Sequence, residues 1–230
     1  MLHFWQIIQT PDNGETTEVD TSIVLTYVPV WPLVVQLICG VFCMSCSAIY
    51  HLCQVKNETF KKILNRLDYS GIIILIMGSS MPINYYPFAC PSTHKERNIF
   101  MMIILSSGFV CFVAILTPYF HRREMKPLLA TLYVILGLSA CLPNYYLSYM
   151  KSGEDAADYS KDYCMWDLRN WWYGGFFYIF GAFIYAKKIP EKHYPKRFDH
   201  IGSSHQLFHI FIVIAAFIHL KASYELYIDR

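Results

Sequence analysis

The chain has 230 residues, of which 55% are hydrophobic and only 16% are charged, and its mean hydropathy is +0.30. Soluble globular domains carry about 25% charged residues, so this composition disfavours a soluble protein. The formal net charge is only +2, so its sign identifies no partner and we expect no nucleic-acid ligand. No signal peptide is predicted, because Met1–Thr10 lacks a basic start and the stretch after it lacks a small-residue cleavage site.

The apolar residues gather into six blocks, each near the roughly 20 residues that an α-helix needs to cross a bilayer. In chain order the blocks lie at about 22–51, 69–87, 98–119, 127–149, 171–187 and 205–224. Buried helices of soluble proteins rarely run this long without a polar face, so a soluble helical protein is the disfavoured alternative. The sequence therefore predicts an all-α, polytopic transmembrane helix bundle over 22–224, followed by an exterior tail at 225–230.

Basic residues divide the connections between these blocks into two sets. Of the nineteen Lys and Arg, twelve lie in the connections at about 52–67, 120–126 and 187–204, with four, three and five respectively. The N-terminal segment, by contrast, carries four acidic residues and no Lys or Arg. By the positive-inside rule, the basic set faces the cytosol and both termini lie outside in this six-span topology.

Two pairs of polar residues, near opposite ends of the chain, are each spaced by four positions. Ser47 and His51 lie in the first apolar block, and His205 and His209 begin the last. Residues four apart share one face of a helix, so each pair presents its side chains in one direction. Together with Asp68, at the start of the second block, they are predicted to lie at one depth near the cytosolic leaflet. Ionisable residues inside a membrane are costly and mark functional sites by default.

These five side chains have the composition of an open zinc site. Imidazoles from His51, His205 and His209 match the three protein ligands of a catalytic zinc site, which keeps water in its fourth position. Asp68 is predicted to orient or deprotonate that water, and Ser47 to hydrogen-bond the water, a ligand or a substrate carbonyl. Singly, each residue has a plainer interpretation: an interhelical histidine, an Asp68 helix cap, or a Ser47 bond to a carbonyl one turn earlier. The shared depth favours one site.

The cysteines give weaker signals. Cys39, Cys43 and Cys46, in the first block, are interpreted as small packing residues rather than metal ligands. Cys90 and Cys164 are the only cysteines in predicted exterior loops, and an oxidising lumen would allow a disulfide bond between them. The sequence leaves that disulfide open.

The other histidines are less suited to the site. His200, in a predicted cytosolic loop, is the only substitute ligand among them. His219 lies ten residues beyond His209, which puts it roughly 80° away from that residue's face of the helix.

With these residues assembled, the chain resembles the progestin and adipoQ receptor family, which includes the adiponectin receptors. Three motifs carry the resemblance: Ser47-Ala-Ile-Tyr-His51, Leu67-Asp68-Tyr69-Ser70-Gly71 and Ser204-His205-Gln206-Leu207-Phe208-His209. The segment with Ile189-Pro190-Glu191 and Phe198-Asp199 is also similar to the family's lead-in to its last helix. The resemblance covers about residues 21–224.

The resemblance implies a seven-helix fold with a cytosolic N-terminus and an exterior C-terminus, of which six spans are seen here. It implies His51, His205 and His209 as the zinc ligands, Asp68 as the residue that holds the metal-bound water, and Ser47 in the same constellation. One departure concerns the family's first helix, for which the stretch LHFWQII is the one candidate remnant and is too short to span. Either the chain lacks that helix or the sequence begins inside a longer gene product. Residues 1–21 are therefore expected to form an exterior tail or a remnant of that helix.

Two functions follow from the resemblance, because family members are regarded as hormone or lipid receptors and some as ceramide-hydrolysing amidases. In the first, the chain is a zinc-binding, receptor-like membrane protein with a latent hydrolase activity, in which zinc and Asp68 cleave the amide of a ceramide-like lipid. In the second, the chain is a receptor or scaffold in which zinc is purely structural. The expected partners are a lipid or hormone-like ligand, membrane lipids and a cytosolic signalling partner, and the expected location is the plasma membrane or an endomembrane.

Overall fold

The described part of the chain is mostly helical. The computed structural model describes residues 28–53, 57–89, 93–121, 125–152, 169–194, 197–198 and 201–228. Its α-helices are α1 (Trp31–Cys53), α2 (Glu58–Tyr85), α3 (His94–Leu116), α4 (Lys126–Ser152), α6 (Arg169–Lys187) and α7 (Ser204–Ile228), with short 3₁₀ helices at Tyr86–Phe88 and Pro118–His121. These described residues contain no strand, which confirms the all-α class.

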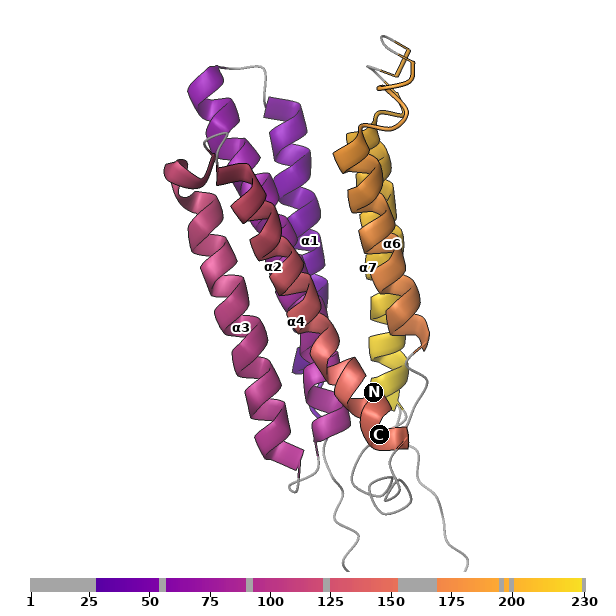
Figure 1. Cartoon of the computed structure of the whole chain (residues 1–230). Helices are drawn as coiled ribbons and strands as arrows, with labels where there is room; N and C mark the ends of the chain where they lie inside the picture. The colour runs from indigo at the N-terminus through magenta and orange to yellow at the C-terminus, as the bar shows by residue number, and fades with distance from the viewer. Residues whose placement is uncertain are drawn as a thin grey trace, which may run out of the picture.

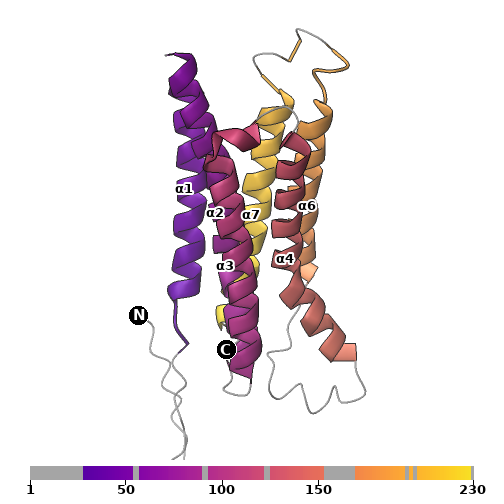
Figure 2. The same cartoon turned by 60° about the vertical axis from the view of Figure 1, so that its left-hand side comes forward.

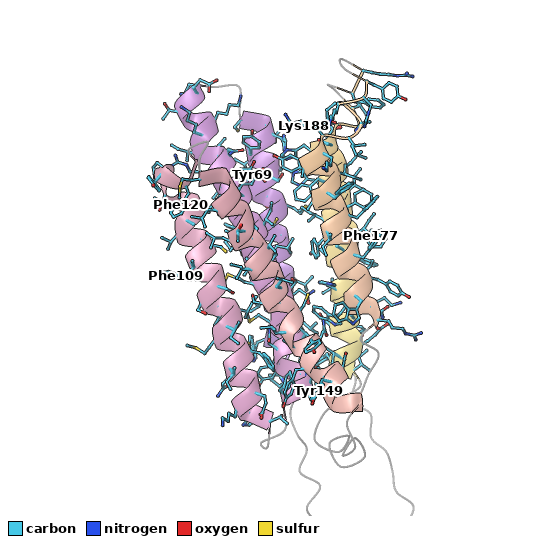
Figure 3. The ribbon with its side chains drawn as sticks, viewed as in Figure 1. Tyr69, Phe109, Phe120, Tyr149, Phe177 and Lys188 are labelled. Carbon is cyan, nitrogen blue, oxygen red and sulfur yellow. The ribbon has the colours of Figure 1, made fainter. Side chains whose placement is uncertain are left out.

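The six α-helices correspond to the six apolar blocks. Three of them, α1, α3 and α7, are long and apolar enough to cross a membrane by length and composition. Large apolar side chains cover the outside of the bundle, as expected for a surface that faces lipid rather than water. Phe109 on α3 is 66% exposed, and Phe109 and Phe177 lie on opposite sides of the bundle (Figure 3).

The helices form an elongated bundle in which α1 to α4 pack together and α6 pairs closely with α7 (Figures 1 and 2). Helix α7 also contacts α1 and α2, so it joins the two groups. The connections from α1 to α2, α3 to α4 and α6 to α7 all lie at one end of the bundle, and the start of α1 and the end of α7 lie toward the other (Figure 1). The three basic connections therefore share one end, as the alternation of loop charge predicts.

Helix α2 begins earlier than the apolar block suggests. It starts at Glu58 rather than at about 69, because the side chain of Asn57 caps it by accepting a hydrogen bond from the backbone N–H of Phe60 at 2.7 Å. Much of the connection expected at 52–67 is thus the charged first part of this helix. Asp68 lies inside α2, so its interpretation as a helix cap is wrong.

Close packing of α1 on α2 involves the cysteines of α1 and two glycines of α2. A Cβ atom at Gly78 would lie 2.4 Å from Cβ of Cys39, and one at Gly71 would lie 3.1 Å from Cα of Cys43. The cysteines are free thiols, and Cys43 and Cys46 are buried. This agrees with their interpretation as packing residues.

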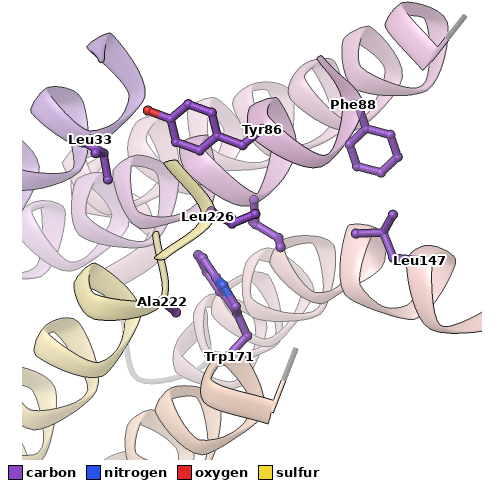
Figure 4. Packing of buried hydrophobic residues seen from close by; sticks show 8 residues of the cluster. Leu33, Tyr86, Phe88, Leu147, Trp171, Ala222 and Leu226 are labelled. Carbon is purple, nitrogen blue, oxygen red and sulfur yellow. The ribbon is translucent and has the colours of Figure 1, made fainter. Parts of the chain in front are cut away.

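Three buried apolar clusters make up the described core. One, toward the end of the bundle away from the basic connections, contains Leu33, Ile83, Tyr86, Phe88, Leu147, Trp171, Ala222 and Leu226 (Figure 4). Another, nearer the polar residues, contains Cys43, Leu75 and Ile212. The third contains residues of α2, α3 and α4 only. The first two clusters hold α7 against α1 and α2.

Some predictions fall outside the described residues. These are the N-terminal segment 1–21, the substitute ligand His200 and the disulfide between Cys90 and Cys164. Within the described part, α7 continues to Ile228, beyond the expected end of its block at 224.

Candidate metal centre

The predicted site residues come together from three helices. His51 is in the last turn of α1, Asp68 lies on α2, and His205 and His209 lie at the start of α7. One potential ligand atom from each of these four residues lies within 4.8 Å of the others. Antiparallel packing of α1 on α7 brings the two four-residue spacings face to face. The structure thus assembles side chains that are about 160 positions apart in sequence.

The three histidines converge through the same ring atom. Nε2 of His51 lies 3.3 Å from Nε2 of His205, which lies 2.9 Å from Nε2 of His209. Tetrahedral zinc, with Zn–N distances of about 2.0–2.1 Å, holds two imidazole nitrogens about 3.3–3.4 Å apart. The separation of His51 from His205 matches that edge length, and the separation of His205 from His209 is shorter than it by about 0.4 Å. A ring nitrogen that carries a proton can donate a hydrogen bond but cannot accept one. Three Nε2 atoms that face one another therefore cannot all be paired by hydrogen bonds, whereas their lone pairs form a good ligand set for a cation.

Burial of Asp68 also fits a cation at this place. Its side chain is only 2% exposed, and its Oδ1 atom has no hydrogen-bond partner among the described residues. A buried carboxylate is very costly unless it is paired or coordinates a metal. The chemistry of this donor set, three neutral imidazoles and one carboxylate, therefore fits a divalent metal such as zinc.

Ser47 lies beside the four-residue group. Its side chain is 6% exposed, and its Oγ atom is 3.0 Å from Nε2 of His209. The hydroxyl group also approaches the carboxyl group of Asp68. Ser47 is therefore in contact with a predicted metal ligand and a predicted acid–base residue at once.

Three tyrosines from α2, α4 and α6 form a contact chain that begins at His205, and no sequence pattern indicated it. The ring of Tyr185 packs edge-on against the ring of His205, with centroids 5.2 Å apart. Its hydroxyl lies 3.1 Å from that of Tyr69, whose backbone carbonyl accepts a hydrogen bond from Tyr133 at 3.1 Å. Only the position of Tyr69, directly after Asp68, could have suggested one of these residues. The others come from α4 and α6, at no regular spacing from the motifs.

Glu191 fixes the start of the helix that carries two of the histidines. Its carboxylate accepts hydrogen bonds from the backbone N–H of Ser204, at 2.8 Å, and from the Ser204 hydroxyl. Partial burial raises the pKa of Glu191, but the hydrogen bonds from Ser204 and nearby Lys188 lower it overall. An anion at a helix N-terminus also interacts favourably with the helix dipole. The segment similar to the family's lead-in thus positions His205.

The fold and the site together define a class: helical membrane proteins with a cluster of histidines and one carboxylate at the end of the bundle where the basic connections lie. The sequence profile of the haemolysin-III related family matches residues 13–220 of the chain. The chain therefore belongs to the haemolysin-III related family, and it is a membrane protein similar to adiponectin and progestin receptors.

Several curated relatives share the match. The adiponectin receptor protein of Drosophila melanogaster is 31% identical over 83% of this chain and 41% of its own length. The ADIPOR-like receptor IZH2 of Saccharomyces cerevisiae is 36% identical over 80% of this chain and 56% of its own length. The heptahelical transmembrane protein ADIPOR2 of Oryza sativa is 31% identical over 85% of this chain and 81% of its own length. The chain spans about half the length of the first two.

Proposed function

We propose that the chain is a zinc-dependent lipid amidase of receptor-like architecture, which cleaves the amide bond of a ceramide-like lipid. The observation that carries the proposal is the convergence of three imidazole nitrogens beside a buried carboxylate that has an unpartnered oxygen. Three neutral protein ligands leave an open position on tetrahedral zinc, as catalytic sites require. By the positive-inside rule this end of the bundle faces the cytosol, so the site lies near the cytosolic leaflet, at the depth of a lipid amide group.

Each residue of the site has a role in this reaction. His51, His205 and His209 would hold the zinc ion through Nε2. When bound, zinc activates a water molecule and polarises a carbonyl group. Asp68 accepts a proton from the attacking water and passes it to the amide nitrogen as the C–N bond breaks, which releases a fatty acid and a long-chain base. The hydroxyl of Ser47 orients the water or the substrate carbonyl by a hydrogen bond.

Metal content and ceramide hydrolysis, measured on the same purified protein, test the proposal. Wild type should contain one zinc per chain, and His209→Ala should lose it. Asp68→Asn should keep the metal, because the three imidazoles remain, and lose turnover by about 10²–10⁴-fold. His193→Ala is the control, since His193 is exposed and lies outside the four-residue group. Hydrolysis that persists at the wild-type rate in Asp68→Asn would refute the acid–base role.

A receptor with a structural metal is the second proposal, and the distribution of the ligands favours it as an alternative. The group draws on α1, α2 and α7, so a bound metal would tie the α6–α7 pair to the other helices. In that case Asp68→Asn would change little beyond thermal stability, and zinc removal would lower the unfolding temperature without ending any turnover. A lipid or hormone-like ligand and a cytosolic signalling partner belong to this proposal.

A further inference from the structure

A second buried polar region lies on the same helix faces as the metal centre, further along the bundle. It contains Gln36 of α1, Ser79 of α2 and His219 of α7, which are 4%, 4% and 8% exposed. We call these three residues the polar layer. None of the three belongs to the group around the metal centre.

The register of α1 against α7 places Gln36 and His219 at the same level. Contacts and shared clusters pair the two helices in antiparallel order: His51 with His205, Ser47 with His209, Cys43 with Ile212, and Leu33 with Ala222. Gln36 is three residues after Leu33, and His219 is three residues before Ala222, so one helical turn separates each from the same cluster. Both therefore lie on the interior faces that also carry the metal-site residues.

Ser79 lies at this level on α2. Leu75 belongs to the cluster of Cys43 and Ile212, and Ile83 belongs to the cluster of Leu33 and Ala222. Ser79 is four residues from each of them, on the same helix face. The polar layer is thus enclosed between two apolar clusters, of which the one beyond it is seen in Figure 4.

Helix α6 fixes both the position and the tautomer of His219. A Cβ atom at Gly174 would lie 2.1 Å from Cδ2 of His219, so the Cδ2–Nε2 edge of the ring lies against α6, and the ring packs on Trp171 at 4.4 Å. Nε2 is 3.2 Å from the backbone carbonyl of Trp171, which can only accept, so Nε2 carries the proton and donates. In the neutral ring, Nδ1 is then an acceptor on the edge that faces away from α6.

Several atoms of the polar layer lack partners within the described residues. Nδ1 of His219 and both polar atoms of the Gln36 amide group are buried with no hydrogen bond. Ser79 donates to the carbonyl of Ile76 and keeps its oxygen able to accept. Buried polar atoms without partners are costly, and native proteins pair nearly all of them with protein, water or ligand. An acceptor on His219 and a donor on Gln36 at one level match the two capacities of a hydroxyl group.

We propose that the polar layer binds a hydroxyl group, which donates a hydrogen bond to Nδ1 of His219 and accepts one from Nε2 of Gln36. The hydroxyl has two sources. One is an ordered water molecule, the usual partner of such groups. The other is a hydroxylated lipid chain whose head group lies at the metal centre, ten residues away along α7, or about 15 Å. The lipid source rests on the proposed function, and the water source does not.

Binding of two fatty acids to the full chain in detergent distinguishes the sources. The probes are 12-hydroxystearic acid, whose hydroxyl lies far from its carboxylate, and stearic acid. If the lipid is the source, wild type binds the hydroxylated probe about tenfold more tightly, which corresponds to one buried hydrogen bond. Gln36→Leu abolishes this preference. Ile38→Leu, at a neighbouring position that is 62% exposed, is the matched control and keeps it.

If water is the source, wild type binds both probes equally, but Gln36→Leu lowers the unfolding temperature relative to Ile38→Leu. The ¹⁵N chemical shift of Nδ1 in His219 should then be that of an unprotonated nitrogen that accepts a hydrogen bond. This measurement needs only the wild type, so it tests the proposal even if Gln36→Leu fails to fold. Equal probe binding together with an unchanged or raised unfolding temperature in Gln36→Leu would overturn the proposal, as would a protonated Nδ1. Zinc content and ceramide hydrolysis are measured on the same preparations, so absent turnover counts only against the amidase.

Discussion

Replacement of Gly78 by alanine should push α1 away from α2 and disturb the candidate metal centre. An added Cβ atom would lie 2.4 Å from Cβ and 2.5 Å from Sγ of Cys39. Non-bonded carbon atoms normally lie about 3.5–4.0 Å apart, so the two backbones must separate by about 1 Å. Rotation of the Cys39 side chain cannot relieve the contact, because its Cβ is fixed to the backbone. Helix α1 carries Ser47 and His51, and α2 carries Asp68, so the shift reaches the ligand set.

The size of the effect follows from a comparison with Gly137 on α4, where an added Cβ atom would meet nothing within 4 Å. Both substitutions gain the same intrinsic helix propensity, about 1 kcal/mol. Only Gly78→Ala suffers the overpacking, which typically costs about 1–3 kcal/mol. We therefore expect Gly78→Ala to be less stable than Gly137→Ala by about 1–3 kcal/mol, or several degrees in unfolding temperature at about 2–4 °C per kcal/mol.

Thermal unfolding in detergent, with zinc content measured alongside, is the assay. The double variant Gly78→Ala/Cys39→Gly removes both clashing atoms and leaves the Val35 carbonyl at an ordinary 3.5 Å. A double-mutant cycle should then show a favourable coupling between the two positions. The reasoning is wrong if Gly78→Ala is as stable as Gly137→Ala, or if Cys39→Gly restores nothing in the cycle.

Three further predictions concern caps and site residues. Asn57→Ala should destabilise the start of α2 by about 0.5–2 kcal/mol, as measured by thermal unfolding, and Asn57→Asp, which keeps a cap oxygen, should not. Because Ser204 hydrogen bonds outweigh burial and lower the pKa of Glu191, its stabilisation is present above the ordinary value of 4.5 and is lost as pH falls through the lowered pKa. The difference in unfolding temperature between wild type and Glu191→Gln should therefore shrink in acid, and a constant difference would contradict this. Ser47→Ala should retain zinc but lose about tenfold in ceramide turnover, since one hydrogen bond is removed. Loss of zinc from Ser47→Ala would instead show that the contact with His209 supports the ligand set.

The sequence by itself determined the helices and the candidate ligand set, because both follow from patterns within a few residues. Six apolar blocks of bilayer length predict six helices, and residues four apart share a helix face whatever the surroundings. The positive-inside rule then assigns every second connection to the same side of the membrane. That assignment predicts one depth for the five site residues, which are Ser47, His51, Asp68, His205 and His209. The same local logic failed at the start of α2, where the apolar pattern begins later than the helix. There, Asn57 caps the helix about twelve residues before the apolar block begins, so hydrophobicity alone does not mark the helix start.

Only the tertiary structure decided which faces meet and in what register. Nothing in the spacing of Tyr185 or Gln36 connects either residue to a histidine on α7. Their neighbours follow from the close approach of helices, as at Gly174 against His219, where the absence of a side chain lets two helices meet. Periodicity, extrapolated from His209, also put His219 about 80° away from the helix face that carries His209. Packing against Trp171 and Gly174 of α6 nevertheless buries it.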